Sequence, residues 1–182
     1  MIRAVAIVCA LCAAASASPW KTSRGTLATG RLPGSWILSS DAAPGRYSEA
    51  GMFTTEPVAL PFKLEATWRR LGPEAGRSMH VLVAGGIVLI KSGAIAFYAY
   101  DDAAFAQGDW KPIPGHAAQA PHDLVIEQDK LRVIVKLDGA EVGRYDLAIP
   151  RDTGNIGFGM KSAPGLRSSI YVHSVKINGQ SQ

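Results

Sequence analysis

Apolar and polar residues alternate strictly in several short segments of this chain, and this two-residue period restricts the fold more than any other feature. In the segment "FKLEATWR", residues 62–69, every second residue is apolar and the residues between them are Lys, Glu, Thr and Arg. Successive side chains of a β-strand point to opposite faces, so the segment predicts a strand with one buried and one wet face. Apolar residues at helical spacing are almost absent after the first twenty residues, which predicts an all-β chain.

Short turn signals separate the alternating segments. Gly85-Gly86 divides two apolar segments, and glycine tolerates the positive φ of a tight hairpin. Asp129-Lys130 and Asp138-Gly139 divide a predicted antiparallel meander. Further strands are expected at residues 36–39, 52–55, 95–100 and in two segments between residues 154 and 177. The total of roughly ten or eleven short strands is typical of a sandwich of two sheets.

Two stretches, residues 23–34 and residues 101–120, show no period and are expected to be irregular, with a short strand in the second as an open alternative. The second stretch contains Trp110 together with Pro112, Pro114 and Gly115. Loops of this length inside a compact domain are more often functional than accidental. Trp110 is therefore a candidate for a side chain that faces a ligand.

The first seventeen residues resemble a signal peptide for export. Arg3 supplies a positive charge, an apolar run follows, and Ala15-Ser16-Ala17 has the small-x-small form of a cleavage site. The apolar run is shorter than the roughly 20 residues that a membrane-spanning helix needs. A lipoprotein anchored through Cys12 is the alternative, although Leu11 stands where a small residue is expected. We expect residues 1–17 to be a signal peptide, residues 18–182 to be a single domain, and the protein to be secreted or periplasmic, with no transmembrane segment after signal removal.

The cysteine and charge patterns restrict the class of protein further. Cys9 and Cys12, the two cysteines of the chain, both lie in the predicted signal peptide, so the core of the mature domain has to hold it together without disulfides. Residues 18–182 are enough for one well-buried domain. The chain has 19 basic and 15 acidic residues, and the basic residues are scattered. Nucleic-acid binding requires a concentrated basic stripe, so no nucleic-acid partner is expected.

Four segments together resemble the concanavalin A-like lectin/glucanase superfamily. They are "PFKLEATWRR", "HDLVIEQDKLRVIVKLDGAEVGRYDL", "GNIGFGMKS" and "IYVHSVKI". The resemblance extends over about residues 53–177 and is strongest to laminin G-like and bacterial sugar-hydrolase-type domains. It implies a jelly-roll sandwich of two curved antiparallel sheets, in which the concave sheet commonly carries the ligand.

The glycines of the "GNIGFGMKS" segment are interpreted as structural. Glycine in a strand permits a bulge or the close approach of a neighbouring strand, and Gly154, Gly157 and Gly159 are assigned to that role. The large residues that alternate with them are expected to point into the core; they are Ile156, Phe158 and Met160. This segment is therefore predicted to close a sheet and to carry no chemistry.

The acidic residues do not form the pattern of a glycosidase. Glycoside hydrolysis usually needs two carboxylates about 5 to 10 Å apart. The glucanases that the chain resembles place theirs on one strand as Glu-x-Asp-x-x-Glu, which this sequence lacks. Glu65 is alone in its strand, and Asp101-Asp102 is explained by a turn. No catalytic residue is predicted, although a carboxylate pair assembled from different strands stays open.

The sequence predicts no metal site and no cofactor. The four histidines are separated from one another and none has a ligand-type partner at metal-binding spacing; they are His80, His116, His122 and His173. A calcium ion held by Asp101, Asp102 and Asp109 is an alternative that the sequence leaves open.

One wet face is the best candidate for binding. If Ile95 and Phe97 are buried, then Tyr98 and Tyr100 point to the opposite side. The candidate ligand-binding residues are Tyr98, Tyr100, Trp110, Arg69, Glu65 and His80. Aromatic rings cover the apolar faces of sugars while polar groups take the hydroxyls, so this composition suits a carbohydrate. An ordinary solvated sheet surface is the alternative, since tyrosine is a good strand former.

These observations lead to one functional hypothesis with two alternatives. The preferred hypothesis is an exported, non-catalytic β-sandwich domain that binds a carbohydrate or cell-envelope polymer. The first alternative is a glycoside hydrolase or lyase on the same fold, and the second is a protein-interaction domain. An acidic pair, an aromatic groove or a flat apolar patch would distinguish the three.

Overall fold

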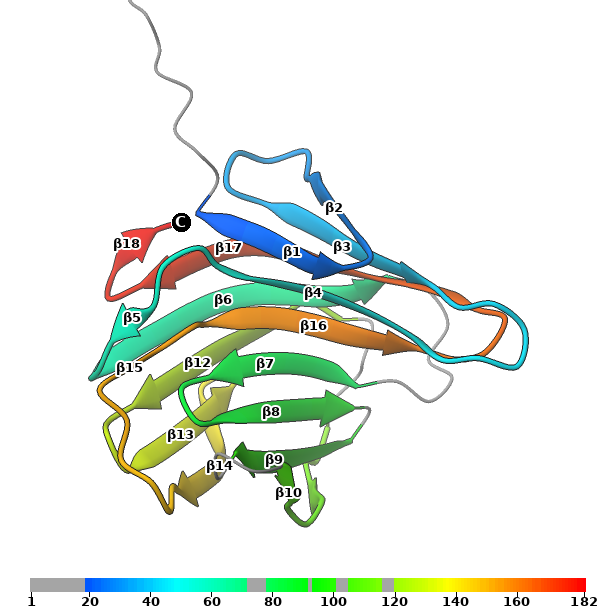
Figure 1. The fold of residues 1–182 in the computed structure, drawn as a ribbon. Coiled ribbons are helices and arrows are strands. Elements are labelled where there is room, and N and C mark those ends of the chain that lie inside the picture. The colour runs from blue at the N-terminus through cyan, green and yellow to red at the C-terminus, as the bar shows by residue number, and fades with distance from the viewer. Residues whose placement is uncertain (1–18, 72–77, 92, 101–104, 116–119) are drawn as a thin grey trace, which may run out of the picture.

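The structure, a computed structural model, describes residues 19–71, 78–91, 93–100, 105–115 and 120–182 (Figure 1). Every regular element in these ranges is a β-strand, which confirms the all-β prediction. The described residues also include no helix long and apolar enough to cross a membrane. The predicted signal peptide lies outside them, as do Asp101, Asp102 and His116.

Most strands belong to two large antiparallel sheets. Sheet A has, in spatial order, β1 (Trp20–Arg24), β4 (Ser48–Thr54), β16 (Gly157–Ser162), β7 (Met79–Val83), β8 (Gly86–Lys91), β9 (Ala94–Tyr100) and β10 (Phe105–Gln107), with β11 (Lys111–Pro112) also paired to β9. Sheet B has β14 (Ala140–Asp146), β13 (Arg132–Leu137), β12 (His122–Gln128), β6 (Phe62–Leu71), β17 (Arg167–Ile177), β3 (Trp36–Asp41) and β2 (Thr26–Thr29), with β18 (Gln180–Ser181) paired to β17. Two short strands, β5 (Val58–Ala59) and β15 (Thr153–Gly154), form a separate pair.

The two large sheets pack face to face as a sandwich, with sheet A in front of sheet B in Figure 1. Strands from the end of the chain occupy interior positions in both: β16 lies between β4 and β7, and β17 lies between β6 and β3. The last part of the chain therefore completes both sheets, as the sequence predicted for the "GNIGFGMKS" segment.

Inward side chains from both sheets form one hydrophobic core. The alternation in β6 is observed as predicted, because Phe62, Leu64, Ala66 and Trp68 are all buried. Trp68 is only 1% exposed. Burying an aliphatic or aromatic side chain of this kind contributes roughly 1.5 to 3 kcal/mol, so the core can hold the domain without a disulfide.

The predicted inward positions of two other strands are also confirmed. In β9, Ile95 and Phe97 are buried while Tyr98 is half-buried on the opposite side. Ile156, Phe158 and Met160 are likewise buried in the core. The turn before β8 contains Gly85 with a φ of 81°, as the hairpin prediction requires.

The first irregular segment of the sequence proves to contain regular structure. Residues 23–34 include the end of β1 in sheet A and all of β2 in sheet B. Gly25 joins these two strands with a φ of 74°, and a Cβ there would lie 2.4 Å from the carbonyl oxygen of Ser39. This glycine lets the chain pass from one sheet to the other, a transition that leaves no periodic signal in the sequence.

Candidate functional site

The outer face of sheet A carries two adjoining hollows with volumes of about 320 Å³ and 420 Å³. Glu49, His80 and Ile87 line both hollows, so together they form one depression, here called the groove. Its lining comes from β1, β4, β16, β7, β8 and β9, and from Trp110. Neighbouring strands lie about 4.8 Å apart, so a groove across six strands is about 24 Å long. An extended chain molecule fits this shape better than a single small ring.

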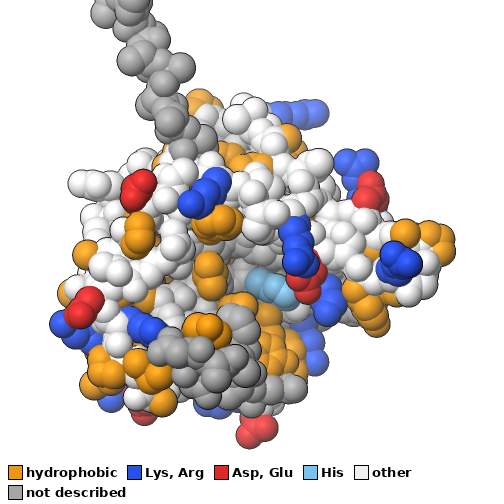
Figure 2. Space-filling model, viewed as in Figure 1, with side chains coloured by type: hydrophobic (Ala, Val, Ile, Leu, Met, Phe, Trp, Pro, Cys, Tyr) orange, Lys and Arg blue, Asp and Glu red, His pale blue; other side chains and the backbone are white. Residues whose placement is uncertain are grey.

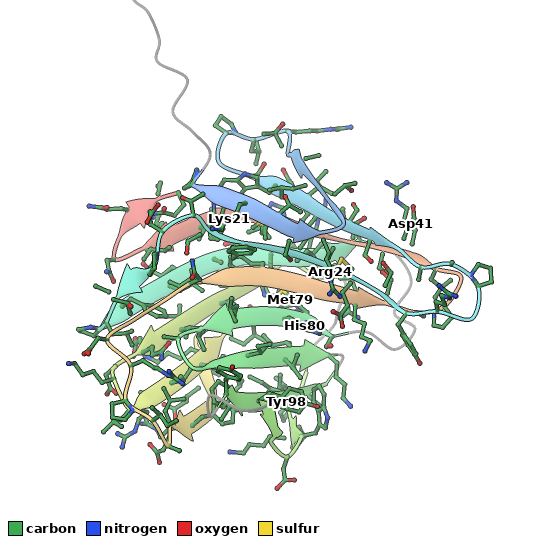
Figure 3. All side chains as sticks on the ribbon, viewed as in Figure 1. Lys21, Arg24, Asp41, Met79, His80 and Tyr98 are labelled. Carbon is green, nitrogen blue, oxygen red and sulfur yellow. The ribbon has the colours of Figure 1, made fainter. Side chains whose placement is uncertain are left out.

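Side chains from distant parts of the sequence follow one another across this face. Figure 3 labels Lys21 and Arg24 of β1 on one side, His80 of β7 in the middle and Tyr98 of β9 on the other side. Figure 2 shows the same face in space-filling form, with a histidine side chain near its centre and basic side chains around it.

Glycines form the middle of the groove floor. In the register of sheet A, Gly51 lies opposite Gly159, which in turn lies opposite His80 on β7. Gly157 lies opposite Phe53. The large residues next to these glycines in β4 and β16 are buried, so the glycines themselves face the groove. Peptide backbone therefore lines this part of the groove.

Close packing explains why these floor positions hold glycine. A Cβ at Gly157 would lie 2.5 Å from the carbonyl oxygen of Met52, and a Cβ at Gly51 would lie 2.7 Å from Oγ of Ser23. The predicted role of Gly157, close approach of a neighbouring backbone, agrees with this geometry. The groove that the same lack of side chains opens could not be predicted, because the pairing of β4 with β16 cannot be inferred from either segment alone.

Aromatic rings lie at both ends of the groove. Tyr98 and Trp110 line the end at β9, and Phe53 lines the end at β1 and β4. Two of these rings each have a lysine over them. Lys91 Nζ is 3.9 Å from the centroid of the Trp110 ring, and Lys21 Nζ is 5.0 Å from the centroid of the Phe53 ring. Phe53 was not among the predicted residues, and only its place next to buried Met52 in an alternating strand could have indicated it.

His80 supplies an uncharged polar group in the middle of the groove. Its Nε2 lies 2.8 Å from the hydroxyl oxygen of Ser78. Burial lowers the pKa of His80 to about 4; nearby Glu49 opposes this shift and Lys161 adds to it. The ring is therefore neutral near pH 7, and offers a hydrogen-bond donor or acceptor without a charge.

The groove contains few acidic groups. Glu49 is the only carboxylate among the described residues that line it. One oxygen of Glu49 lies 3.7 Å from the guanidinium of Arg24, and the other lies 3.8 Å from the ammonium of Lys161. Two carboxylates arranged for acid and base catalysis are therefore not found among these lining residues.

The structure brings together three of the six predicted binding residues. His80, Tyr98 and Trp110 all line the groove, although they come from β7, from β9 and from the segment before β11. Tyr100 points outward near the end of β9, is 39% exposed, and lies beyond the groove lining.

Glu65 and Arg69 do not join that group, because β6 belongs to sheet B and their side chains lie on the opposite surface of the sandwich. Oε1 of Glu65 lies 2.9 Å from Nζ of Lys63, whose hydrogen bond lowers the pKa of the Glu65 carboxyl. The Arg69 guanidinium lies 5.7 Å from the centre of the Tyr171 ring. Alternation correctly placed both side chains on a wet face, but it could not tell which sheet that face belongs to.

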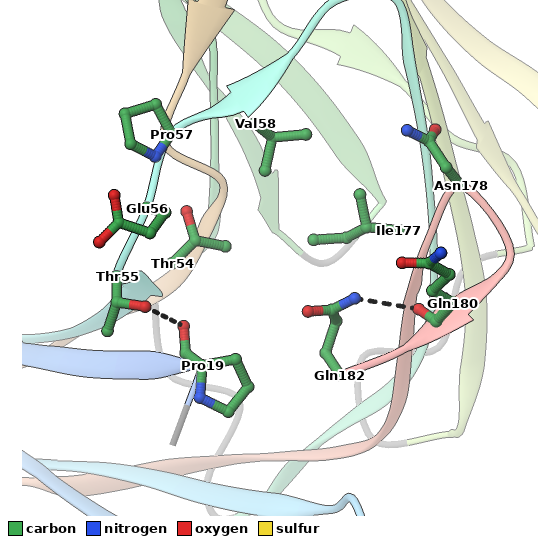
Figure 4. A pocket seen from close by; sticks show the side chains of 10 residues that line it. All are labelled: Pro19, Thr54, Thr55, Glu56, Pro57, Val58, Ile177, Asn178, Gln180 and Gln182. Atoms are coloured by element: carbon green, nitrogen blue, oxygen red, sulfur yellow. Dashed lines mark hydrogen bonds between the residues drawn. The ribbon is translucent and has the colours of Figure 1, made fainter. Parts of the chain in front are cut away.

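A separate hollow of about 350 Å³ lies where the two ends of the described chain meet (Figure 4). Its lining is mostly amide, hydroxyl and proline side chains; the residues are Pro19, Thr54, Thr55, Glu56, Pro57, Val58, Ile177, Asn178, Gln180 and Gln182. Its polar groups already hydrogen-bond one another in part, since Thr55 donates to the carbonyl of Pro19 and Gln182 donates to that of Gln180. No aromatic residue is among those lining it, so the groove on sheet A is the better candidate.

The described residues include no group of three or more His, Cys, Asp or Glu side chains that could hold a metal ion. Asp109, the one described member of the aspartate set considered for calcium, lies in an exposed position next to Trp110.

Comparison with known proteins establishes the fold. No protein-family model and no curated protein matches the sequence. Among solved structures, the carbohydrate-binding module CBM66 from Bacillus subtilis aligns with a TM-score of 0.62 and 15% identity over 88% of this chain and 95% of that chain. A family 16 endo-glucanase from Bacteroides ovatus aligns with a TM-score of 0.63 and 13% identity over 87% and 94%. The chain has the concanavalin A-like jelly-roll fold.

A third concanavalin A-like structure, the metal-free carbohydrate recognition domain of Emp46p, aligns with a TM-score of 0.65 and 11% identity over 90% of this chain and 89% of that chain. The predicted jelly-roll sandwich is thus confirmed. The structural alignments establish the fold, but identities this low say nothing about the roles of individual residues. Those roles are argued from the groove itself.

Proposed function

We propose that the groove on sheet A binds a stretch of a carbohydrate polymer. The observation that carries this proposal is the lining itself: aromatic rings at both ends, a glycine floor between them and neutral His80 at the centre. Aromatic faces cover the apolar C–H surfaces of sugars, and polar groups beside them bind hydroxyls. The names of two structural neighbours, a carbohydrate-binding module and a carbohydrate recognition domain, support the same class of ligand.

The proposed activity is binding without cleavage. A retaining or inverting glycosidase needs two carboxylates on either side of the scissile bond. Among the described lining residues only Glu49 carries a carboxylate, and two cations share it. A single carboxylate cannot supply the acid and base pair that this chemistry needs.

The proposed location is outside the cytoplasm. The positive residue, apolar run and small-x-small site of residues 1–17 support export through a cleaved signal peptide. Mass spectrometry of the exported protein should find an N-terminus near Ser18. Recovery of the protein with Cys12 retained and lipidated would contradict this.

Affinity electrophoresis through gels that contain single polysaccharides tests the binding proposal. Tyr98→Ala and Trp110→Ala should each weaken retention by about tenfold, equivalent to about 1.4 kcal/mol, with little change in thermal stability. Tyr100→Ala should have a smaller effect, because Tyr100 lies beyond the groove lining.

A control variant on another surface is Leu131→Ala, whose side chain is 50% exposed and lies in the turn between β12 and β13. It should be retained as the unchanged protein is. Retention that survives both Tyr98→Ala and Trp110→Ala would place binding elsewhere. Release of shortened products that disappears in Glu49→Gln would favour the hydrolase alternative instead.

A further inference from the structure

The charges around the groove do not balance. Arg24 and Lys161 both lie at the Glu49 carboxylate, and Lys21 and Lys91 lie over the aromatic rings of the groove. Four cationic side chains thus lie around the groove, whereas Glu49 carries the one carboxylate among its described lining residues. Asp109 and Lys111 stand on either side of Trp110 in the sequence and add one charge of each sign.

Glu49 forms only long ion pairs with the two cations beside it. Its oxygens lie 3.7 Å from Arg24 and 3.8 Å from Lys161, whereas a strong charge-assisted hydrogen bond is about 2.7 to 2.9 Å long. The Arg24 side chain is 74% exposed and that of Lys161 is 42% exposed. Both cations can therefore bind a second anionic group that enters the groove.

The lysines over the rings favour the same kind of ligand. A sugar that stacks on the ring face covered by the lysine takes the place of the Lys91 ammonium at Trp110 or of the Lys21 ammonium at Phe53. A neutral sugar offers the displaced ammonium only uncharged oxygen acceptors, which form weaker hydrogen bonds with it than an anion does. An acidic sugar brings its own anion, so the lysine can exchange the ring for a carboxylate or sulfate.

Sheet B shows that this excess of positive charge is local. On its outer face, Lys63 pairs with Glu65 and Lys136 pairs with Glu127, each at 2.9 Å. The edge strands β13 and β14 contribute two further pairs at the same distance, Arg132 with Asp146 and Arg144 with Glu141. These four cations of sheet B have carboxylate partners at hydrogen-bonding distance, whereas Arg24 and Lys161 of the groove lie 3.7 and 3.8 Å from theirs.

We infer that the ligand of the groove is an acidic polysaccharide, one whose sugars carry carboxylate or sulfate groups. This inference rests on the proposed function, because it assigns a ligand class to the same groove. The acid groups would meet Arg24 and Lys161 near the floor and the two lysines at the ends, while the sugar rings cover Phe53 and Trp110.

Matched pairs of polymers test the inference and separate the two acid groups. Isothermal titration calorimetry would compare polygalacturonate with its carboxyl-reduced counterpart, and dextran sulfate with dextran. We expect at least one acidic polymer to bind about tenfold or more tightly than its neutral partner. The affinity should fall as sodium chloride is raised from 0.05 to 0.5 M, because salt shortens the Debye length from more than about 10 Å to less than about 5 Å.

Variants then locate the charge effect. Arg24→Gln and Lys161→Gln should each weaken binding of the acidic polymer about threefold to fivefold and leave thermal unfolding unchanged. Glu49→Gln should strengthen it, because the variant removes the one described acid of the groove. Lys176→Gln, an exposed lysine on sheet B, is the matched control and should have no effect.

Each contrary outcome has a distinct meaning. If a neutral polymer binds as tightly as its acidic partner and Tyr98→Ala weakens it, the proposed function holds and the acidic ligand class is wrong. If Lys176→Gln weakens acidic polymers as much as Arg24→Gln does, the protein attracts polyanions through its overall charge and the inference fails. If Tyr98→Ala, Trp110→Ala and Arg24→Gln all leave binding unchanged, both proposals fail.

Discussion

Each large sheet presents one face to solvent, and the two faces differ in how they are built. On sheet B, long side chains of opposite charge pair at about hydrogen-bonding distance, as Lys63 does with Glu65, beside a hollow of about 390 Å³. On sheet A, glycines at three groove-facing positions of β4 and β16 leave the backbone without side chains. Aromatic rings and cations in excess of the acids surround these glycines. Strands of both sheets, such as β6 and β7, nevertheless show the same alternation of buried and less buried residues.

This difference shows that alternation identifies a wet face but does not say what the face is for. A strand with polar outward residues shows the same alternation whether those residues pair with their neighbours or bind a ligand. What distinguishes the faces is the partner of each outward residue. Gly159, for example, has glycine on one side and His80 on the other.

The largest expected effect compares the two sides of one strand in sheet A. Phe97→Ala should lower the free energy of unfolding by about 3 to 5 kcal/mol, because the ring is buried and stacks on Tyr145 at 4.9 Å. Tyr98→Ala, on the groove side, should cost clearly less. Urea denaturation of both variants measures this, and equal losses would mean that the outer face of sheet A is packed as a core.

A second prediction compares a histidine from each face. The pKa of His80 is about 4 when folded, whereas an unfolded histidine has a pKa of about 6.5, so the unfolded chain binds more protons between these values. Stability should therefore fall as the pH is lowered from about 6.5 to about 4, by an amount on the order of 3 kcal/mol, and His80→Gln should remove this dependence.

His173 on sheet B provides the comparison for that titration. Burial, followed by the charge of Arg69, also lowers the pKa of His173, but only the shift at His80 is large. In an NMR titration of the imidazole signals, His173 should therefore protonate at a higher pH than His80. A pKa of His80 near 6.5 would show that the middle of the groove is more open to water than the structure indicates.

A third prediction concerns the glycine floor. Gly157→Ala should destabilise the domain by about 1 to 3 kcal/mol, because the new Cβ would meet the Met52 carbonyl oxygen, which belongs to the neighbouring strand and cannot easily move. Ser174→Ala, at an exposed position on sheet B, should stay within about 0.5 kcal/mol of the unchanged protein. Thermal unfolding of both variants tests whether the two outer faces differ in how well they tolerate substitution by alanine. Equal melting temperatures would remove the steric reason for glycine at Gly157.

The smallest expected effect on stability is on the outer face of sheet B, where charged side chains pair. Glu65→Gln breaks the pair with Lys63, but both side chains are well exposed, so the melting temperature should change little. Polysaccharide retention should not change at all, since Glu65 lies on sheet B. Loss of retention in Glu65→Gln would mean that the ligand binds the face assigned here to charge pairing, and the comparison of the two faces would have to be reversed.

Much of the architecture could be predicted because its determinants are local. The alternation of residues 62–69 identified β6 and the burial of Trp68, and Gly85 identified the hairpin before β8 through its positive φ. Each of these features depends on a few consecutive residues, whose side-chain directions and backbone freedom do not require a partner strand. The resemblance of four such segments then led to the correct sandwich.

The binding groove depended on strand order, which no single segment contains. Alternation placed Glu65, Arg69, Tyr98 and His80 on wet faces, yet β6 belongs to one sheet and β7 and β9 to the other. The glycine floor exists only because β16, from the end of the chain, pairs between β4 and β7. Strand pairing is decided by packing among residues far apart in sequence, so the sequence by itself determined which side chains are wet, and the tertiary structure decided which of them meet.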